Sequence, residues 1–245
     1  MGVSTYNWLH LVNFIFYQIK QTLKKLFYLL ILVFLFGNCK KETTTVAAVV
    51  VYDVDGNTYS TVTIGTQTWL TTNLKTTKYR DGIPLSPTTD NTAWTKLDIG
   101  GYSWYNNDVS NKSIYGGLYN WTAVSTGSLC PAGYHVPTDA DWTVLSAYLG
   151  GDAVAGGKLK ETGTAHWLSP NTGATNETGF IGLPGGSRSG TTGTFSDFGV
   201  GGTWWSSTGI DSNSSWFRSL NKDVAGIGRA SGVIGAAYSV RCIKN

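Results

Sequence analysis

A short apolar run near the start of the chain ends at a cysteine, and this arrangement decides which residues take part in folding. Two positive residues, Lys24 and Lys25, precede an uninterrupted apolar stretch, 26–36. That stretch has the length of a signal-peptide core and is too short to span a bilayer as a stable helix. The run leads to Cys39, which polar residues follow at once. Residues 1–38 are therefore interpreted as a leader and left out of fold prediction.

The layout around the cysteine resembles a bacterial lipoprotein signal, with the looseness typical of Bacteroidetes-type signals. In such signals the cysteine is lipidated and becomes the first residue of the mature chain. The resemblance implies that Cys39 carries a lipid and that the membrane is a partner through this anchor. We therefore expect the protein in the cell envelope, lipid-anchored to the outer membrane and facing either the periplasm or the cell surface. The alternative is an ordinary membrane anchor.

The mature chain carries no net charge. Three of the 18 Lys and Arg residues lie in the leader, so 15 remain against 15 Asp and Glu. Nucleic-acid binding depends on a basic surface, so we predict no nucleic-acid partner. Residues 39–49 are predicted to form a lipidated tether. Residues 50–245 are long enough for one sizeable core and are predicted to form a single domain.

Two cysteines remain in the mature chain, Cys130 and Cys242. An even pair in an exported protein predicts one disulfide, and the competing interpretation is two buried free thiols. The loop between them is 112 residues long. Closing a loop of that size stabilises the fold by roughly 4–5 kcal/mol in the chain-entropy model. Two distant cysteines lack the spacing of metal ligands, so no metal site is predicted from them.

Short strands and turns dominate the domain, with one clear helix. Asp55–Asn57 contains an Asp-Gly turn between two β-forming runs, which predicts a hairpin. Thr138 is placed as the N-cap of a helix from residue 139 to 149, and Asp141 completes an acidic capping pattern. Three apolar residues fall on one face of that helix: Trp142, Leu145 and Leu149. A weaker helical stretch is predicted near residues 153–161.

Several motifs follow one another in a characteristic order. They are Thr63–Leu70, Asn73–Thr76, Gly101–Asp108, Tyr115–Trp121, Leu129–Trp142, Gly156–Lys160, Leu183–Gly186, Trp204–Thr208 and Ser239–Cys242. Their order and spacing closely resemble the Fibrobacter succinogenes major paralogous domain, a family of exported and often lipidated bacterial domains. The resemblance covers residues 51–244, which is nearly the whole mature chain.

A fainter likeness connects three segments with the formylglycine-generating and C-type-lectin-like superfamily. His135–Trp142 looks like its helix start, Pro184–Ser187 like its Gly-Gly turn, and Val240–Cys242 like its closing strand. This likeness implies an irregular α+β domain with twisted antiparallel strands, one or two helices and long loops. A bridge between Cys130 and Cys242 would suit such a fold.

No catalytic motif stands out in the chain, and no cofactor or metal is predicted. His135 lies in an apolar run and is interpreted as a structural histidine. Gly226–Ser231 nearly copies a dinucleotide motif but lacks the last glycine and a following helix pattern, so we predict a loop. The carboxylate pairs Asp139/Asp141 and Asp53/Asp55 are explained by capping and turn formation. An enzyme of the same fold with an unrecognised site, for example one acting on polysaccharide, remains the alternative.

Aromatic residues flanked by amides and hydroxyls favour a non-catalytic binding or adhesion module for a glycan or a protein ligand. Aromatic faces stack on sugar rings, and the same chemistry serves protein recognition. The predicted ligand-binding residues are Trp104, Tyr105, Asn106, Asn107 and Asp108, with Arg188 and Trp205 as neighbours. Core packing is the alternative for any single tryptophan. Strand alternation predicts that one of Trp204 and Trp205 points inward and the other outward.

Overall fold

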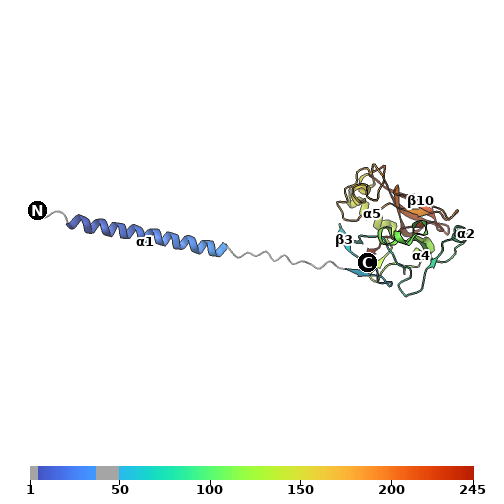
Figure 1. The fold of residues 1–245 in the computed structure, drawn as a ribbon, viewed down its shortest axis with the longest axis horizontal. Coiled ribbons are helices and arrows are strands. Elements are labelled where there is room, and N and C mark those ends of the chain that lie inside the picture. The colour runs from blue at the N-terminus through green and yellow to red at the C-terminus, as the bar shows by residue number, and fades with distance from the viewer. Residues whose placement is uncertain (1–4, 37–49) are drawn as a thin grey trace. The chain divides into compact units, whose positions relative to one another are not determined.

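The computed structural model describes residues 5–36 and 50–245, and the chain divides into two compact units, Met1–Ala47 and Ala48–Asn245 (Figure 1). In the first unit, α1 (Thr5–Phe36) is a single helix of 32 residues. None of the helices in the described residues is both long and apolar enough to cross a membrane. The predicted lipidation residue, Cys39, and the tether that follows it lie outside the described residues.

The second unit begins with the predicted hairpin. Strand β1 (Val51–Tyr52) pairs antiparallel with β2 (Thr58–Tyr59), which confirms the turn expected from the Asp-Gly sequence. The turn is closed by the carboxylate of Asp53, which accepts backbone N–H groups of Asp55 and Asn57 at 3.0 and 2.9 Å. Gly56 has a φ of +80°, a conformation that glycine adopts without steric cost.

A four-stranded antiparallel sheet brings both ends of the domain together. Its strand order is β3-β4-β15-β8, and its strands are β3 (Thr61–Ile64), β4 (Gln67–Leu70), β15 (Ile243–Lys244) and β8 (Tyr134–His135). The last strand thus lies between strands from the start and the middle of the domain. The disulfide between Cys130 and Cys242, which confirms the predicted bridge, lies just before the two neighbours β8 and β15.

A nine-stranded mixed sheet forms the larger layer. Its order is β13-β12-β11-β9-β14-β7-β6-β5, and β10 pairs with β9. The strands are β5 (Ser86–Pro87), β6 (Gly101–Ser103), β7 (Leu118–Asn120), β9 (Gly185–Arg188), β10 (Phe195–Phe198), β11 (Gly201–Gly209), β12 (Ser214–Asn221), β13 (Ile227–Val233) and β14 (Ala237–Tyr238). The prediction of a loop over Gly226–Ser231 is therefore wrong. Most of this segment forms β13, whose residues pair with those of β12.

Short helices cover the sheets, so the domain combines helices and sheets as the α+β prediction requires. Both predicted helices are confirmed: α5 (Asp139–Tyr148) begins with the capping box of Thr138 and Asp141, and α6 (Asp152–Leu159) follows it. Three shorter helices are α2 (Asn91–Thr95), α3 (Lys112–Tyr115) and α4 (Trp121–Ser125). Two 3-10 turns, η1 (Tyr105–Asn107) and η2 (Val109–Asn111), precede α3.

Strand β11 is buried on both of its faces. Trp205 belongs to the core that surrounds the disulfide, whereas Trp204 packs into a second core with Trp142 and Leu145 of α5. The exposed fraction is 1% for Trp204 and 0% for Trp205. The prediction that one of the two rings faces outward is wrong because alternation here separates two cores instead of a core and solvent.

Candidate functional site

Residues 104–111, here called the aromatic loop, connect β6 to α3 and contain the predicted ligand-binding segment. Trp104 and Tyr105 are half-buried, while Asn106, Asn107 and Asp108 are exposed. The two asparagines have φ values of +55° and +57°. Asparagine tolerates this left-handed conformation better than most residues, so the sequence suits the sharp bend. The structure therefore groups five of the predicted site residues on one loop.

Hydrogen bonds inside and beneath the aromatic loop fix its conformation. The side-chain amide of Asn107 donates to the carbonyl of Thr89 at 3.0 Å, and that of Asn111 donates to the carbonyl of Tyr105 at 3.0 Å. The carboxylate of Asp108 accepts the backbone N–H of Ser110 at 2.9 Å. This hydrogen bond lowers the pKa of Asp108, which stays charged at neutral pH. The loop is thus an ordered platform despite its exposure.

Trp104 and Tyr105 engage different partners. The Trp104 ring lies 5.2 Å from the ring of Tyr102 in an edge-to-face arrangement, and the Nζ of Lys112 lies 5.5 Å from its centroid. The Tyr105 ring stacks on Phe198 at 4.6 Å and meets the edge of Phe195 at 5.3 Å. One loop therefore presents two aromatic surfaces, and the Trp104 surface has the ammonium group of Lys112 beside it.

The Tyr105 surface continues through further rings to the pair of His166 and Glu161. Phe198, which is 37% exposed, contacts Tyr115 at 4.7 Å, and Tyr115 contacts His166 at 5.7 Å. The Nδ1 of His166 lies 2.8 Å from a carboxylate oxygen of Glu161. Burial, followed by the charge of Glu161, raises the pKa of Tyr115, so this phenol is neutral at physiological pH. Sequence reasoning missed these residues because they come from separate segments without a shared motif.

The prediction that Arg188 contacts ligand is wrong, because its side chain is fully buried. Its guanidinium carbon lies between two rings, 4.3 Å from the centroid of Trp94 and 4.7 Å from that of Phe195. Burial lowers the pKa of Arg188 to about 10. The side chain donates to the carbonyls of Gly193 and Thr88 at 2.8 and 2.6 Å. Its polar atoms are thus committed within the domain.

Arg188 nevertheless supports the aromatic loop from beneath. It donates a further hydrogen bond at 3.0 Å to the carbonyl of Thr89, the same carbonyl that accepts the amide of Asn107. A carbonyl has two lone pairs, so one oxygen can serve both donors. Two hydrogen bonds that share this carbonyl therefore connect Arg188 to Asn107 in the aromatic loop.

The prediction that Trp205 lies beside the ligand is also wrong. Its Nε1 donates to the carbonyl of Tyr119 at 2.7 Å, and its ring lies 4.4 Å from the ring of Tyr238. A buried tryptophan normally finds a partner for its N–H, and this one is satisfied inside the core. Trp205 belongs to the scaffold.

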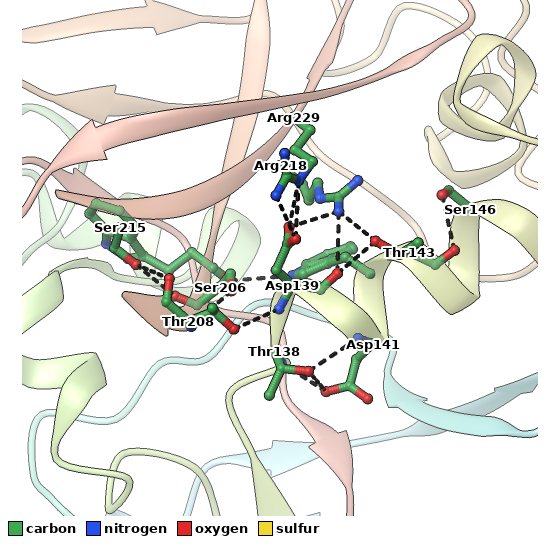
Figure 2. Close-up of polar contacts among 12 residues, drawn as sticks. Thr138, Asp139, Asp141, Thr143, Ser146, Ser206, Thr208, Ser215, Arg218 and Arg229 are labelled. Carbon is green, nitrogen blue, oxygen red and sulfur yellow. Dashed lines mark hydrogen bonds and ion pairs between the residues drawn. The ribbon is translucent and has the colours of Figure 1, made fainter. Parts of the chain in front are cut away.

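Of the carboxylate pair at the start of α5, Asp141 caps the helix as predicted, whereas Asp139 forms ion pairs that the sequence did not predict. Figure 2 shows the guanidinium groups of Arg218 and Arg229 converging on the carboxylate of Asp139, with Nη2 to oxygen distances of 2.8 and 2.9 Å. The carboxylate of Asp141 instead accepts the backbone N–H and the hydroxyl of Thr138 at 2.8 and 2.6 Å. The two ring nitrogens of His135 contact the side chains of Asp141 and Asn245, as expected of a histidine whose polar atoms have partners within the domain.

Within residues 5–36 and 50–245, no group of three or more His, Cys, Asp or Glu side chains is placed to hold a metal ion. The features that stand out on the domain are instead aromatic: an ordered loop with half-buried rings, exposed amides and a neighbouring cation.

The comparison with protein families agrees with the order of motifs in the sequence. The family model of the Fibrobacter succinogenes major domain matches residues 62–244, and the chain belongs to this family. The match begins inside β3, so the hairpin of β1 and β2 precedes it and the aromatic loop lies within it. No curated protein and no solved structure matches the chain.

Proposed function

We propose that the domain is a non-catalytic binding module of the cell envelope and that its aromatic loop binds a glycan. The observation that carries the proposal is the loop itself, which holds the half-buried rings of Trp104 and Tyr105 next to exposed side chains of Asn106 and Asn107. Aromatic faces stack on the apolar faces of sugars, and amides hydrogen-bond to sugar hydroxyls. Functional residues gather on loops that a rigid scaffold positions.

The hydrogen bonding of the loop favours binding in two ways. The side-chain amide of Asn107 donates one N–H to the carbonyl of Thr89, so the side-chain oxygen of Asn107 is left for a ligand. The side chain of Asn106 has no hydrogen-bond partner among the described residues. An ordered loop also loses little conformational entropy when a ligand binds. The arrangement thus supplies exposed donors and acceptors at a small ordering cost.

The leader supports an anchored module. A positive segment, an apolar core and Cys39 at its end are the features by which lipoproteins are exported and lipidated. In this proposal Cys39 carries the lipid and the tether to residue 49 holds the domain at the outer membrane.

We also propose that the α+β domain has the C-type-lectin-like arrangement of the formylglycine-generating superfamily. Three observations support this: the capped start of α5 at Thr138, the left-handed Gly186 in β9 with φ of +68°, and the disulfide beside the last strand. A superposition of the domain on members of that superfamily, strand by strand, tests the assignment. A different strand connectivity would contradict it.

A glycan and protein array probed with the full chain in detergent micelles tests the binding function. We expect glycan binding, and Trp104→Ala is expected to weaken it by about 1–3 kcal/mol, roughly 5- to 150-fold, as loss of a stacking ring does. The matched control is Tyr148→Ala, because Tyr148 is an aromatic residue that is 64% exposed on α5.

Two results would contradict the proposal. One is that Trp104→Ala binds the glycan as tightly as the wild type does, while Tyr148→Ala loses affinity for it. The other is cleavage of the bound glycan, detected as shorter products, which would favour the enzyme alternative. Binding to proteins alone would contradict the glycan as the ligand, although the domain would still be a binding module.

A further inference from the structure

A hollow of about 430 Å³ lies between the first hairpin and the segment that follows β4. Ligand sites commonly have volumes of about 300–1,000 Å³, so the hollow is large enough for a sugar residue or two. None of its lining residues belongs to the aromatic loop. They are Val50, Tyr52, Thr58, Tyr59, Ser60, Thr71, Thr72 and Lys75.

Lys75 is the cation in this lining, and its ammonium group makes no ion pair within the described part of the chain. Its Nζ lies 5.2 Å from the ring centroid of Tyr59. The nearby carboxylate of Asp53 is already engaged by the hydroxyl of Tyr59 at 2.6 Å and the amide of Asn57 at 2.8 Å. An ammonium group has three N–H donors, so Lys75 can offer hydrogen bonds to an incoming anion.

The electrostatic setting of Lys75 favours an anion. Partial burial, and then the positive charge of Lys112, lower the pKa of Lys75, while the charge of Asp53 raises it. Both lowering effects mean that the charged ammonium is stabilised less here than in water. An anion placed in the hollow would offset that deficit, because an opposite charge favours the charged form.

The remaining lining suits a sugar. The ring of Tyr52 is 63% exposed and offers a face for stacking. Thr58 and Ser60 are exposed and carry hydroxyls. The hydroxyl of Thr72 is buried and has no hydrogen-bond partner among the described residues, so a ligand hydroxyl that reached it would satisfy an otherwise unpaired group.

We propose that this hollow binds a sugar that carries a carboxylate, a uronic acid, with Lys75 contacting the carboxylate. A single ammonium balances the single charge of a carboxylate, whereas a phosphate dianion would call for more cations. Tyr52 stacks on the sugar ring, and the threonine and serine hydroxyls contact its hydroxyl groups. The site shares no residue with the aromatic loop and stands whether or not the loop binds a glycan.

Titration calorimetry of the full chain in detergent micelles, with a galacturonic acid oligomer as the probe, tests the site. Lys75→Met removes the charge and keeps an unbranched apolar side chain that is one atom shorter, and we expect roughly ten-fold weaker binding or more from the loss of a charge-assisted contact. The matched control is Lys96→Met, because Lys96 is exposed and makes no ion pair within the described residues. It should bind within about two-fold of the wild type, a change of less than roughly half a kcal/mol. The methyl ester of the oligomer, which has lost its charge, should bind about as weakly to the wild type as the free acid binds to the Lys75→Met variant.

Thermal melts of the two methionine variants show whether each of them is folded. If Lys75→Met melts early, Lys75→Arg provides a variant that keeps the positive charge. Lys75→Arg should restore most of the affinity. The proposal is overturned if the wild type does not bind the oligomer, if the two methionine variants bind it equally, or if the methyl ester binds as tightly as the free acid. A loss of binding in Trp104→Ala with no change in Lys75→Met would assign the uronate to the aromatic loop and also overturn it.

Discussion

Asp139→Asn is expected to destabilise the domain through the buried arginine that it leaves behind. The side chain of Arg218 is 1% exposed and pairs with Asp139 at 2.8 Å, whereas that of Arg229 is 39% exposed (Figure 2). Nη2 of Arg218 also donates to Thr143 at 3.0 Å, but its Nε has no hydrogen-bond partner in the described part of the chain. Without the carboxylate, a buried guanidinium would lose its counter-charge.

The magnitude follows from how deeply each partner is buried. Removing one member of a buried ion pair costs about 3–5 kcal/mol, and an exposed pair contributes about 0–1 kcal/mol. Asparagine keeps one oxygen that can accept from Arg218, and the carboxylate of Asp139 is 16% exposed, so it is not fully buried. We therefore expect a loss near the lower limit, about 2–4 kcal/mol in the free energy of unfolding at pH 7.

The loss should depend on pH. Burial alone would raise the pKa of Asp139, but the hydrogen bonds and charges of Arg229 and Arg218 outweigh it and hold the pKa below its ordinary value of 3.8. A carboxyl whose pKa is lowered by folding contributes stability above its unfolded pKa, and this contribution disappears as the pH falls through the folded pKa. The difference between wild type and variant is therefore complete at neutral pH and shrinks below roughly pH 4.

Urea denaturation of the wild type and of Asp139→Asn, at pH 7 and in steps down to about pH 2, measures this difference in stability. Asp98→Asn is the control, because it makes the same chemical change at an exposed residue. A double-mutant cycle with Arg218→Met should give a larger coupling energy than the cycle with Arg229→Met. A loss below about 1 kcal/mol at pH 7, typical of a surface pair, would show that Arg218 does not depend on the charge of Asp139. So would a difference that stays constant into acid.

Trp205→Ala is expected to lower stability by about 3–5 kcal/mol in chemical denaturation, since a fully buried ring is lost, and a small change would contradict its place in the core. Replacing Cys130 and Cys242 together by alanine should lower stability by about 2–5 kcal/mol because the bridge closes a long loop. Free-thiol labelling of native protein should find neither cysteine reactive. Cys39→Ser should abolish palmitate labelling and membrane fractionation in a bacterial host, and persistent labelling would reject lipidation at this residue.

Local patterns predicted several elements well because the interactions that form them lie close in sequence. The helix from Asp139 follows from a cap at Thr138, a carboxylate three residues later and glycines at its end, all within about four turns. The turn around Gly56 needs only the Asp-Gly pair and its flanking β-formers. The prediction of a bridge between Cys130 and Cys242 needed only the count of cysteines and the expectation that the protein is exported.

Long-range contacts explain what the sequence did not predict. The sequence suggested that Arg188 is a surface cation. Its donors are instead satisfied by carbonyls about 100 residues away, and no local sequence pattern predicts such contacts. Alternation along β11 correctly predicted that Trp204 and Trp205 lie on opposite faces of the strand. It did not predict that a separate core covers each of these faces. For the site, the sequence predicted the aromatic loop, whereas the neighbouring Phe198 and Lys112 emerge only from the fold.

Hydrogen exchange of the full chain, with and without a glycan selected on the array, measures whether the aromatic loop is the binding surface. We expect slower exchange in residues 104–111 when the glycan is bound, because contacts to Trp104 and the asparagines restrict the opening of the loop. The exposed turn at residues 210–213, between β11 and β12, serves as the internal reference and should exchange at an unchanged rate. Unchanged exchange throughout residues 104–111, with protection elsewhere on the domain, would contradict the assignment of the aromatic loop as the binding surface.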